Sequence, residues 1–479
     1  MSKKILITTA IDYVNDVIHI GHAYQKIVAD ALARYYRADP ENEVFFLTGT
    51  DEHGSKAEEA AEKKRVTPKK FVDDISTQDR EQLDALGITY DRFIRTTDPD
   101  HAAVVVDFYR RSYRNGDIYK GEYRGIYCVG CEEFKKEKDL IDGRCPQHPQ
   151  SEVKTVTEQN YFFRWSKYAD FLRDWIDEHP EFVRHEARRA EMESFLDQGL
   201  EDIPISRPNV KFGIPVPDDP EHVLYVWFDA LINYVTGAPE YWQDQDATII
   251  HLLGKDNVRW HALLWPAMLK SAGYRLPTTV YGHDFFTLNG QKISKSLGNI
   301  IRPTELVEKF GIDGVRYYFL RYGPIRDDVD VTIEGIREVY NADLANGLGN
   351  LTARIASMVA RANSKFEIRS SKQTQNSNFQ NLKQEDQILD EHIKSFRIDL
   401  VLEAIWKKIH ELDRYVDHNR VWEQTGEGQA ESLQYLVENI YAIGLQLAPF
   451  LPVTADKIRD QFGQSLINTQ SSLFPRLTG

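Results

Sequence analysis

The chain has 479 residues, of which 42% are hydrophobic and 28% charged, a composition that favours a soluble globular protein of about three domains. Its net charge of -15 argues against a non-specific nucleic-acid coat, and no apolar run reaches the length of a membrane span. Three cysteines exclude a disulfide scaffold, and Thr8, Thr9 and Asp12 interrupt the apolar amino terminus that a signal peptide would need. We therefore expect a cytoplasmic protein.

The first fifty residues predict a strand, a helix and a second strand. Residues 4–10 (KILITTA) are apolar and β-branched, as in a buried strand, and residues 43–50 (EVFFLTGT) form a similar run that ends at Asp51. Between them a helix is expected from Ala23, with one face formed by Ile27, Ala31, Ala33 and Tyr36. This order predicts a parallel α/β sheet that binds ligands at the carboxyl ends of its strands.

The motif His19-Ile20-Gly21-His22 stands immediately before the expected helix. A helix amino terminus attracts anions, and two histidines three residues apart can donate hydrogen bonds to phosphate oxygens. Gly21 leaves room for a flat ring to approach the backbone. A pair of surface histidines beside a turn is the competing interpretation, because four-residue matches also occur by chance.

The three cysteines and one histidine form two pairs of candidate metal ligands. Cys128-x-x-Cys131 is followed by Cys145-x-x-His148, and this spacing is typical of two knuckles that close a tetrahedral zinc site. The alternative is three unrelated buried thiols and one histidine. A site with four protein ligands has no open position, so the zinc ion would be structural.

Strand-like runs return at residues 248–256 and 278–286, which predicts one nucleotide-binding domain interrupted by an insertion. The loop that follows contains Lys292-Ile293-Ser294-Lys295-Ser296. Its small and polar residues would allow two lysines to close over phosphates, although a solvated basic loop is the simpler interpretation of this motif alone.

From about Asn341 the spacing of apolar residues predicts helices to the end of the chain. Residues 386–422 and 431–451 both repeat apolar side chains at intervals of three and four. Residues 370–380 are rich in Ser, Gln and Asn, and we expect a flexible loop there. The carboxyl-terminal third therefore indicates a helical bundle.

With both motifs in this order, the sequence resembles the class I aminoacyl-tRNA synthetases, whose signatures are HIGH and KMSKS. Within that class the stretches ITTAIDYVNDVIHIGHAY, FLTGTDEHG, YVWFDALINY, GKDNVRWHALLWPAML and LAPFLPVTADKI resemble the methionyl-tRNA synthetase family. The resemblance covers about Lys4 to Phe462. It implies a Rossmann-like parallel-sheet catalytic domain with a zinc-knuckle insertion, followed by an α-helical anticodon-binding domain.

The resemblance implies an enzyme that activates methionine with ATP and transfers it to tRNA(Met), including the initiator tRNA. His19, Gly21, His22, Lys292 and Lys295 would bind ATP, with His19, His22, Lys292 and Lys295 acting in catalysis and Mg²⁺ bound to the nucleotide. Asp51 would bind the methionine ammonium group. The methionine side chain would lie among Ile11, Tyr13, Trp227, Ala230, Tyr234, Trp260 and His261, although aromatic side chains at such positions are also typical of a core.

The tRNA anticodon, by resemblance, would contact Asn350, Arg354 and Trp422, where an aromatic face stacks on unpaired bases. A core tryptophan and a structural arginine are the alternative. Asp12 and Val421 depart from the residues that relatives commonly carry. The chain ends soon after the bundle, without the additional domain through which many relatives dimerise, so we expect a monomer.

The expected domain organisation has five segments: 1–115 and 225–285 for the two halves of the catalytic domain, 116–224 for the zinc-knuckle insertion, 286–340 for the KISKS loop and stem-contact region, and 341–479 for the anticodon-binding domain. A cysteinyl enzyme of the same class is the nearest alternative function. A non-catalytic RNA-binding protein with the same fold, or a nucleotidyltransferase with a similar HIGH motif, would come from another functional class.

Overall fold

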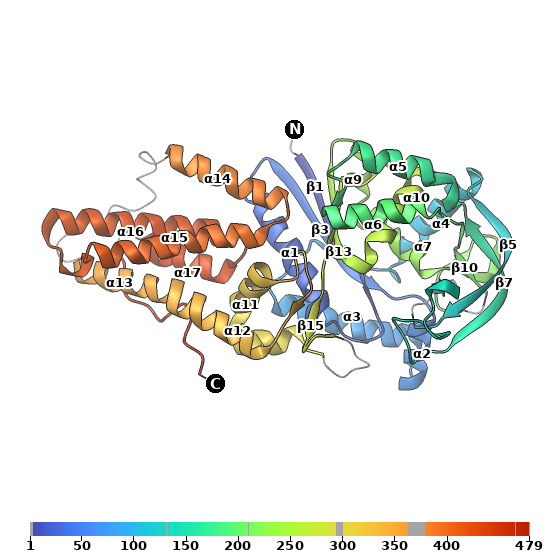
Figure 1. Ribbon diagram of the computed structural model, residues 1–479, viewed down its shortest axis with the longest axis horizontal. Helices are drawn as coiled ribbons and strands as arrows, with labels where there is room; N and C mark the ends of the chain where they lie inside the picture. The colour runs from blue at the N-terminus through green and yellow to red at the C-terminus, as the bar shows by residue number, and fades with distance from the viewer. Residues whose placement is uncertain are drawn as a thin grey trace. The chain divides into compact units, whose positions relative to one another are not determined.

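The computed structural model describes residues 3–130, 133–135, 137–208, 210–293, 300–362, 379–464 and 466–478 (Figure 1). The chain divides into two compact units. The first unit consists of Met1–Val17, Glu43–Arg80 and Tyr90–Gly282, and the second of Ile18–Asn42, Glu81–Thr89 and His283–Gly479. Within the described part of the chain, we find no helix of the length and apolar character that crossing a membrane requires.

A seven-stranded sheet forms the centre of the first unit, in the order β2-β3-β1-β13-β14-β8 with β4 paired to β3. The pairings β1–β13, β2–β3, β3–β4 and β14–β8 are parallel. The strands are β1 (Lys3–Thr9), β2 (Asp12–Tyr13), β3 (Asn42–Asp51), β4 (Arg92–Arg95), β8 (Val183–Arg184), β13 (Thr248–Gly254) and β14 (Thr279–His283). Because Ile5 pairs with Thr248, one sheet is built from distant parts of the chain, as predicted.

Helices connect these strands (Figure 1). They contribute apolar side chains to two core clusters of the first unit. Their bounds are α2 (Ser55–Lys64), α3 (Pro68–Ala85), α4 (Pro99–Arg114), α5 (Ala169–Glu178), α6 (Glu186–Asp197), α7 (Val226–Leu231), α8 (Asn233–Gly237), α9 (Pro239–Gln243) and α10 (Trp265–Ala272), with the π-helical turn η4 (Trp260–Leu264) before α10. Strands β3 and β4 approach closely at Gly49, where a Cβ atom would lie 1.9 Å from the carbonyl oxygen of Ile94.

The insertion is built on a long antiparallel hairpin. Strands β5 (Ile118–Cys128) and β7 (Val153–Phe163) pair along their whole length, from Ile118 opposite Phe163 to Cys128 opposite Val153. β6 (Glu133–Lys135) and β9 (Ile203–Pro204) extend this sheet, and a smaller sheet follows with β10 (Ser206–Arg207), β11 (Pro215–Val216) and β12 (Asp219–Leu224).

The second unit is mostly helical, as expected for the carboxyl-terminal third. It contains α1 (Ile20–Arg37), α11 (Pro303–Tyr322), α12 (Ile333–Val339), the π-helical segment η6 (Tyr340–Gly349), α13 (Asn350–Ala362), α14 (Phe379–Lys394), α15 (Ile398–His418), η7 (Val421–Glu423), α16 (Gly426–Leu447) and α17 (Pro452–Phe462), with a small sheet of β15 (Phe286–Leu288), β16 (Gln291–Lys292) and β17 (Val329–Asp330). Of the loop expected at 370–380, residues 370–378 lie outside the described residues.

Helix α1 corrects two predictions. It begins at Ile20 rather than Ala23, and it buries more than the one face that was expected, because every side chain from Ala23 to Ala33 is buried. The polar residue Asp30 is buried because Arg316 of α11, itself fully buried, places its Nη1 atom 2.7 Å from Asp30 Oδ2. Burial raises the pKa of Asp30, but Arg316 and Arg34 outweigh it and lower that pKa.

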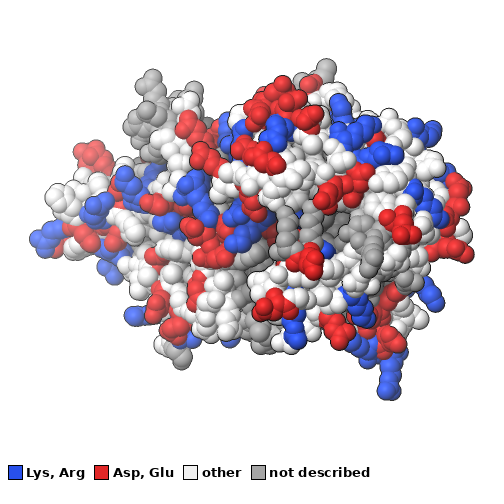
Figure 2. Space-filling model, turned by 45° about the vertical axis from the view of Figure 1, so that its right-hand side comes forward, with Lys and Arg blue, Asp and Glu red and all other residues white. Residues whose placement is uncertain are grey.

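Figure 2 shows acidic and basic side chains interspersed over one face of the molecule. On α3, exposed Lys69 pairs with Asp73 at 2.5 Å and exposed Lys70 with Asp74 at 2.7 Å, each one helical turn away. Such pairs are typical of a solvated helix face.

Candidate active site

The amino terminus of α1 carries the histidine motif. His19 is the N-cap residue, and its Nδ1 accepts a hydrogen bond from the backbone N–H of Gly21 at 3.1 Å. His22 reaches back, and its Nδ1 accepts the backbone N–H of His19 at 3.2 Å. The two rings lie with their centroids 4.0 Å apart. The motif is therefore the first turn of the helix rather than a loop before it.

This cap determines the tautomer of both histidines. A neutral ring that accepts a hydrogen bond at Nδ1 carries its proton on Nε2, so His19 and His22 each have an Nε2–H donor. Gly21 leaves room for this arrangement, because a Cβ atom would lie 2.9 Å from His19 Cε1 and displace the ring. Two N–H donors at the positive end of a helix are suited to bind phosphate.

The lysine motif is described only in part. Lys292 lies in β16 with its backbone opposite Thr287 of β15, and Ile293 is buried. Lys295 falls among residues 294–299, which lie outside the described residues. The role of both lysines therefore stays a prediction.

In the first unit, the expected methionine-binding residues come from three neighbouring segments. Trp227 and Ala230 lie on α7, Tyr234 on α8, and Trp260 and His261 on the π-helical turn η4. The rings of Trp227 and Trp260 stack with centroids 4.8 Å apart, and all of these side chains belong to the core or pack against it. A π-helical turn is rare and occurs frequently at functional sites.

Tyr234 and His261 form a neutral hydrogen-bonded pair inside this region. His261 Nδ1 donates to the carbonyl oxygen of Asn257 at 2.9 Å, so its Nε2 accepts the Tyr234 hydroxyl at 2.8 Å. Burial lowers the pKa of His261 to about 4, which keeps the ring uncharged near neutral pH. Burial, together with the charges of Asp12 and Asp51, raises the pKa of Tyr234 well above its ordinary value.

Asp51 ends β3 and is buried, with its backbone opposite Tyr13 of β2. Its carbonyl oxygen accepts the N–H of Val14 at 2.9 Å. Asp12, which departs from the family pattern, is also buried and lies opposite Thr50. Ile11 and Tyr13 are half-buried. The structure therefore places Ile11, Tyr13 and Asp51 at the carboxyl ends of neighbouring parallel strands, where ligands bind in such sheets.

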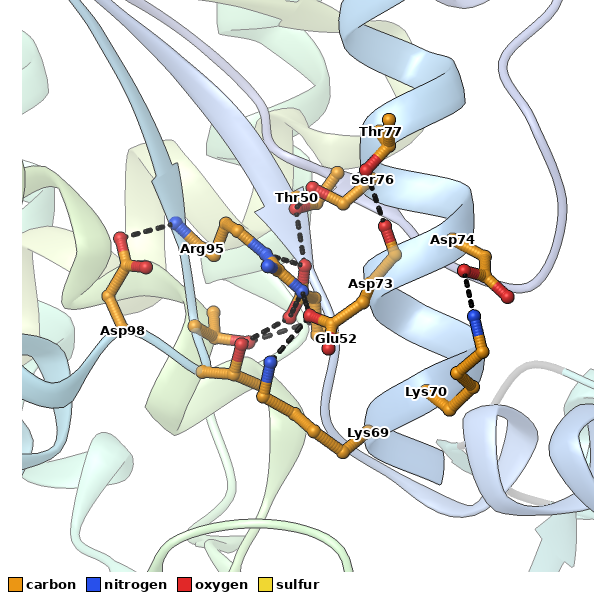
Figure 3. Close-up of polar contacts among 12 residues, drawn as sticks. Thr50, Glu52, Lys69, Lys70, Asp73, Asp74, Ser76, Thr77, Arg95 and Asp98 are labelled. Carbon is orange, nitrogen blue, oxygen red and sulfur yellow. Dashed lines mark hydrogen bonds and ion pairs between the residues drawn. The ribbon is translucent and has the colours of Figure 1, made fainter. Parts of the chain in front are cut away.

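The residue after Asp51 anchors this strand end (Figure 3). Glu52 is fully buried and accepts hydrogen bonds from the guanidinium of Arg95, at 2.5 and 2.9 Å, and from the hydroxyls of Thr50 and Thr97. Arg95 also bonds Asp73 of α3 at 2.6 Å. The sequence analysis did not identify this network. Its signal was a pair of oppositely charged residues, Glu52 and Arg95, that stand at the ends of two apolar strands.

A second missed cluster surrounds Asp229 of α7. This fully buried carboxylate lies 2.6 Å from His53 Nδ1 and 2.8 Å from His101 Nε2. An aspartate inside the apolar run VWFDAL was the signal that could have revealed it.

Three of the four expected metal ligands are brought together in the insertion. The ligand atoms of Cys128, Cys145 and His148 lie within 4.8 Å of one another, and both cysteines are buried and form no disulfide. Cys131 lies outside the described residues. A Cβ atom on Gly130 would lie 2.4 Å from His148 Cγ, so glycine is needed for the histidine to pack there. This group fits the tetrahedral donor set of zinc, whose sulfur ligands lie about 3.8 Å apart.

Two of the three expected anticodon-binding residues, Arg354 and Trp422, lie close together in the helical bundle. Arg354 of α13 bonds Asp413 at 2.6 Å and Asp417 at 2.5 Å, both on α15, and its guanidinium lies 5.9 Å from the ring centroid of Trp422. Trp422 is 47% exposed and Asn350 is exposed on α13. An aromatic face open to solvent beside an oriented arginine is suited to unpaired bases.

Comparison with known proteins gives consistent matches. The family model described as tRNA synthetases class I (M) matches residues 5–356. A methionine–tRNA ligase of Caldanaerobacter subterraneus subsp. tengcongensis is 40% identical over 97% of this chain and 74% of its own length, and one of Nostoc sp. is 39% identical over 99% and 92%. The structure of Mycobacterium tuberculosis methionyl-tRNA synthetase in complex with methionyl-adenylate aligns with a TM-score of 0.90 and 36% identity, covering 99% of this chain and 100% of that one.

Proposed function

The chain belongs to the methionyl-tRNA synthetase family of class I tRNA synthetases, and from this premise we propose which residues perform each step of its reaction. It is an enzyme that activates methionine with ATP, giving methionyl-adenylate and pyrophosphate, and then charges tRNA. The observation that carries this function is the match over nearly the whole chain to a synthetase holding methionyl-adenylate.

The methionine side chain binds among the apolar and neutral groups of Ile11, Tyr13, Trp227, Ala230, Tyr234, Trp260 and His261. The Tyr234–His261 pair supports this role, because it satisfies its own polar atoms and presents no charge to a thioether. Asp51, at the end of β3, binds the ammonium group. Together they select a zwitterion with a flexible apolar side chain.

The carboxylate of methionine attacks the α-phosphate of ATP, a step that needs positioning and charge stabilisation rather than a protein nucleophile. His19 and His22 donate their Nε2–H groups to phosphate oxygens, and Gly21 gives the cap its shape. Lys292 and Lys295 stabilise the leaving pyrophosphate. Mg²⁺, bound through the nucleotide, would neutralise part of the phosphate charge.

Cys128, Cys131, Cys145 and His148 hold one structural zinc ion in the insertion. The burial of Cys128 and Cys145 and the glycine beside His148 support this assignment. Zinc would link the strand ending at Cys128 to the turn at Cys145, and it takes no part in the reaction.

Asn350, Arg354 and Trp422 contact the anticodon of tRNA(Met), both initiator and elongator. The pairing of Arg354 with Asp413 and Asp417 supports a role in reading base edges, since a guanidinium already neutralised by two carboxylates is poorly suited to phosphate. The cytoplasmic location and the monomeric state stay predictions.

The decisive experiment is amino-acid-dependent exchange of pyrophosphate into ATP, measured with each of the twenty amino acids. We expect exchange with methionine alone. Exchange with cysteine would replace the pocket assignment by that of the cysteinyl enzyme. Absence of exchange from a folded, zinc-loaded sample would favour a non-catalytic RNA-binding protein.

A further inference from the structure

The buried carboxylate of Asp229 is not among the residues assigned above. Its Oδ2 lies 2.6 Å from His53 Nδ1, and its Oδ1 lies 2.8 Å from His101 Nε2. Asp229 and His101 have no exposed surface, and His53 is 7% exposed. One side chain therefore holds two histidines that come from separate segments of the first unit.

The direction of each hydrogen bond follows from the groups involved. A carboxylate only accepts, so both histidine nitrogens that face Asp229 carry a proton. Burial raises the pKa of Asp229, but His53 and His101 outweigh it and hold that pKa at about 2. His101 is anchored further, since its Nδ1 lies 3.0 Å from the hydroxyl oxygen of Thr236. Asp229 is thus a fixed, charged acceptor.

The position of this cluster joins two parts of the methionine site. Asp229 lies on α7 between Trp227 and Ala230, which face the methionine side chain in the proposed function. His53 follows Asp51 by two residues, and Asp51 binds the ammonium group in that proposal. The hydrogen bond between Asp229 and His53 therefore spans from the helix of the side-chain pocket to the strand end that carries the ammonium ligand.

Recognition of methionine requires a defined distance between these parts. The ammonium group and the side chain diverge from the same Cα atom, so Asp51 and the pocket must be held at a fixed separation. Glu52 anchors the strand end to Arg95 and α3, but those contacts do not reach α7. The His53–Asp229 hydrogen bond connects residues 51–53 directly to α7.

We propose that Asp229 is a positioning residue for methionine recognition, which acts through His53 to hold Asp51 in register with Trp227 and Ala230. This inference rests on the proposed methionine site. It assigns to the pair no contact with ATP or with the reacting atoms. Loss of the bond should weaken methionine binding before it affects ATP.

The test compares three variants in methionine-dependent pyrophosphate exchange. Asp229→Asn and His53→Ala remove the bond, whereas His53→Asn keeps an N–H donor near the place of Nδ1. We expect the first two to raise the KM for methionine by about tenfold or more, with the KM for ATP changed by less than about twofold. His53→Asn should recover most of the loss seen in His53→Ala.

Asp117→Asn is the matched control. Asp117 is another fully buried carboxylate of the first unit, and it accepts hydrogen bonds from Tyr168 at 2.6 Å and Ser271 at 2.8 Å, neither of which is a proposed methionine-binding residue. It should lower the melting temperature without changing the KM for methionine. If Asp229→Asn fails to fold, the two His53 variants still decide the question.

Two outcomes would overturn the inference. If the KM for methionine of His53→Ala equals that of the control variant, the cluster has only a structural role. The same conclusion follows if the KM values for methionine and for ATP rise by similar factors in all variants. If the unaltered enzyme shows no exchange with methionine, the proposed function fails instead, so the two failures are distinguishable.

Discussion

His19 and His22 cap one helix end reciprocally, since each uses its Nδ1 atom to accept a backbone N–H and keeps its Nε2–H as a donor. The capping role and the proposed catalytic role thus fall on different atoms of the same ring, and a substitution can separate them. Asparagine is a good N-cap residue, and its Oδ1 can replace Nδ1 of His19.

His19→Asn should therefore preserve stability but lose a phosphate donor. We expect a melting temperature near that of the unaltered protein and a fall of about 100-fold in kcat for pyrophosphate exchange. His19→Ala should lose the cap as well, at about 1 kcal/mol of unfolding free energy. Full exchange activity in His19→Asn would remove His19 from the phosphate site.

Acid should destabilise the first unit through His261. The pKa of His261 is lowered by burial to about 4, so the unfolded chain binds a proton more readily than the folded one. Stability from this group is complete above about pH 6.5 and is lost as the pH falls toward about 4, with a loss of about 2 kcal/mol by pH 5.

Urea unfolding at pH 7 and pH 5 measures this effect. The variant His261→Gln has no titrating ring, and it should show a smaller difference between the two pH values than the unaltered protein. An unchanged difference would mean that His261 is not the group responsible.

The zinc knuckle should depend on Gly130. A Cβ atom there would collide with the ring of His148, so Gly130→Ala should weaken zinc affinity by about tenfold or more, measured by competition with a chromogenic chelator. Gly121→Ala on β5 is the control, because its Cβ atom would meet neighbours at 3.4 Å or more, an ordinary contact. Equal zinc retention in both variants would contradict the assignment of His148 as a ligand.

Trp422 should matter only for the step that uses tRNA. Base stacking on an aromatic ring is worth about 1–3 kcal/mol, so Trp422→Ala should lower kcat/KM for tRNA charging by about 5- to 150-fold. Pyrophosphate exchange, which needs no tRNA, should stay the same. Trp422→Phe keeps an aromatic face and should lose less. A parallel loss in exchange would indicate a folding defect instead.

The buried ion pair of the second unit gives a stability prediction. Arg316→Met leaves Asp30 buried with Arg34 as its remaining cationic partner, and we expect a loss of about 3–5 kcal/mol in urea unfolding. Arg337→Met, which breaks an exposed pair with Glu334, should cost less than about 1 kcal/mol. Similar losses in the two variants would argue against a structural role for the buried pair.

Periodicity predicted the elements whose side chains follow a simple rule. The β-branched run at residues 4–10 became a central strand, and the mixed α/β fold is confirmed. Helix α1 was less predictable for two reasons. A histidine N-cap is not among the usual signals for the start of a helix. In addition, Asp30 is buried because it pairs with Arg316, which is far away in the sequence. Long-range pairs leave no local pattern.

The residues of the candidate site also differ in how far the sequence could predict them. Cys128, Cys145 and His148 were predicted from spacing, and the structure brings them together. Arg354 and Trp422 came from family resemblance alone, and they lie in contact. Asp229 was missed, because one acidic residue in an apolar helix gives no sign of the two histidines that accompany it.

The π-helical turn at Trp260–Leu264 makes the proposed methionine pocket sensitive to chain length. Such a turn holds one residue more than an α-helical turn, and the N–H of Trp265 bonds the carbonyl of Trp260 across it. Deletion of Ala262 would allow a regular helix to run into α10, but it would rotate Trp260 and His261 by about 100° around its axis. Deletion of this single codon would therefore reorient two of the proposed pocket residues without replacing either of them.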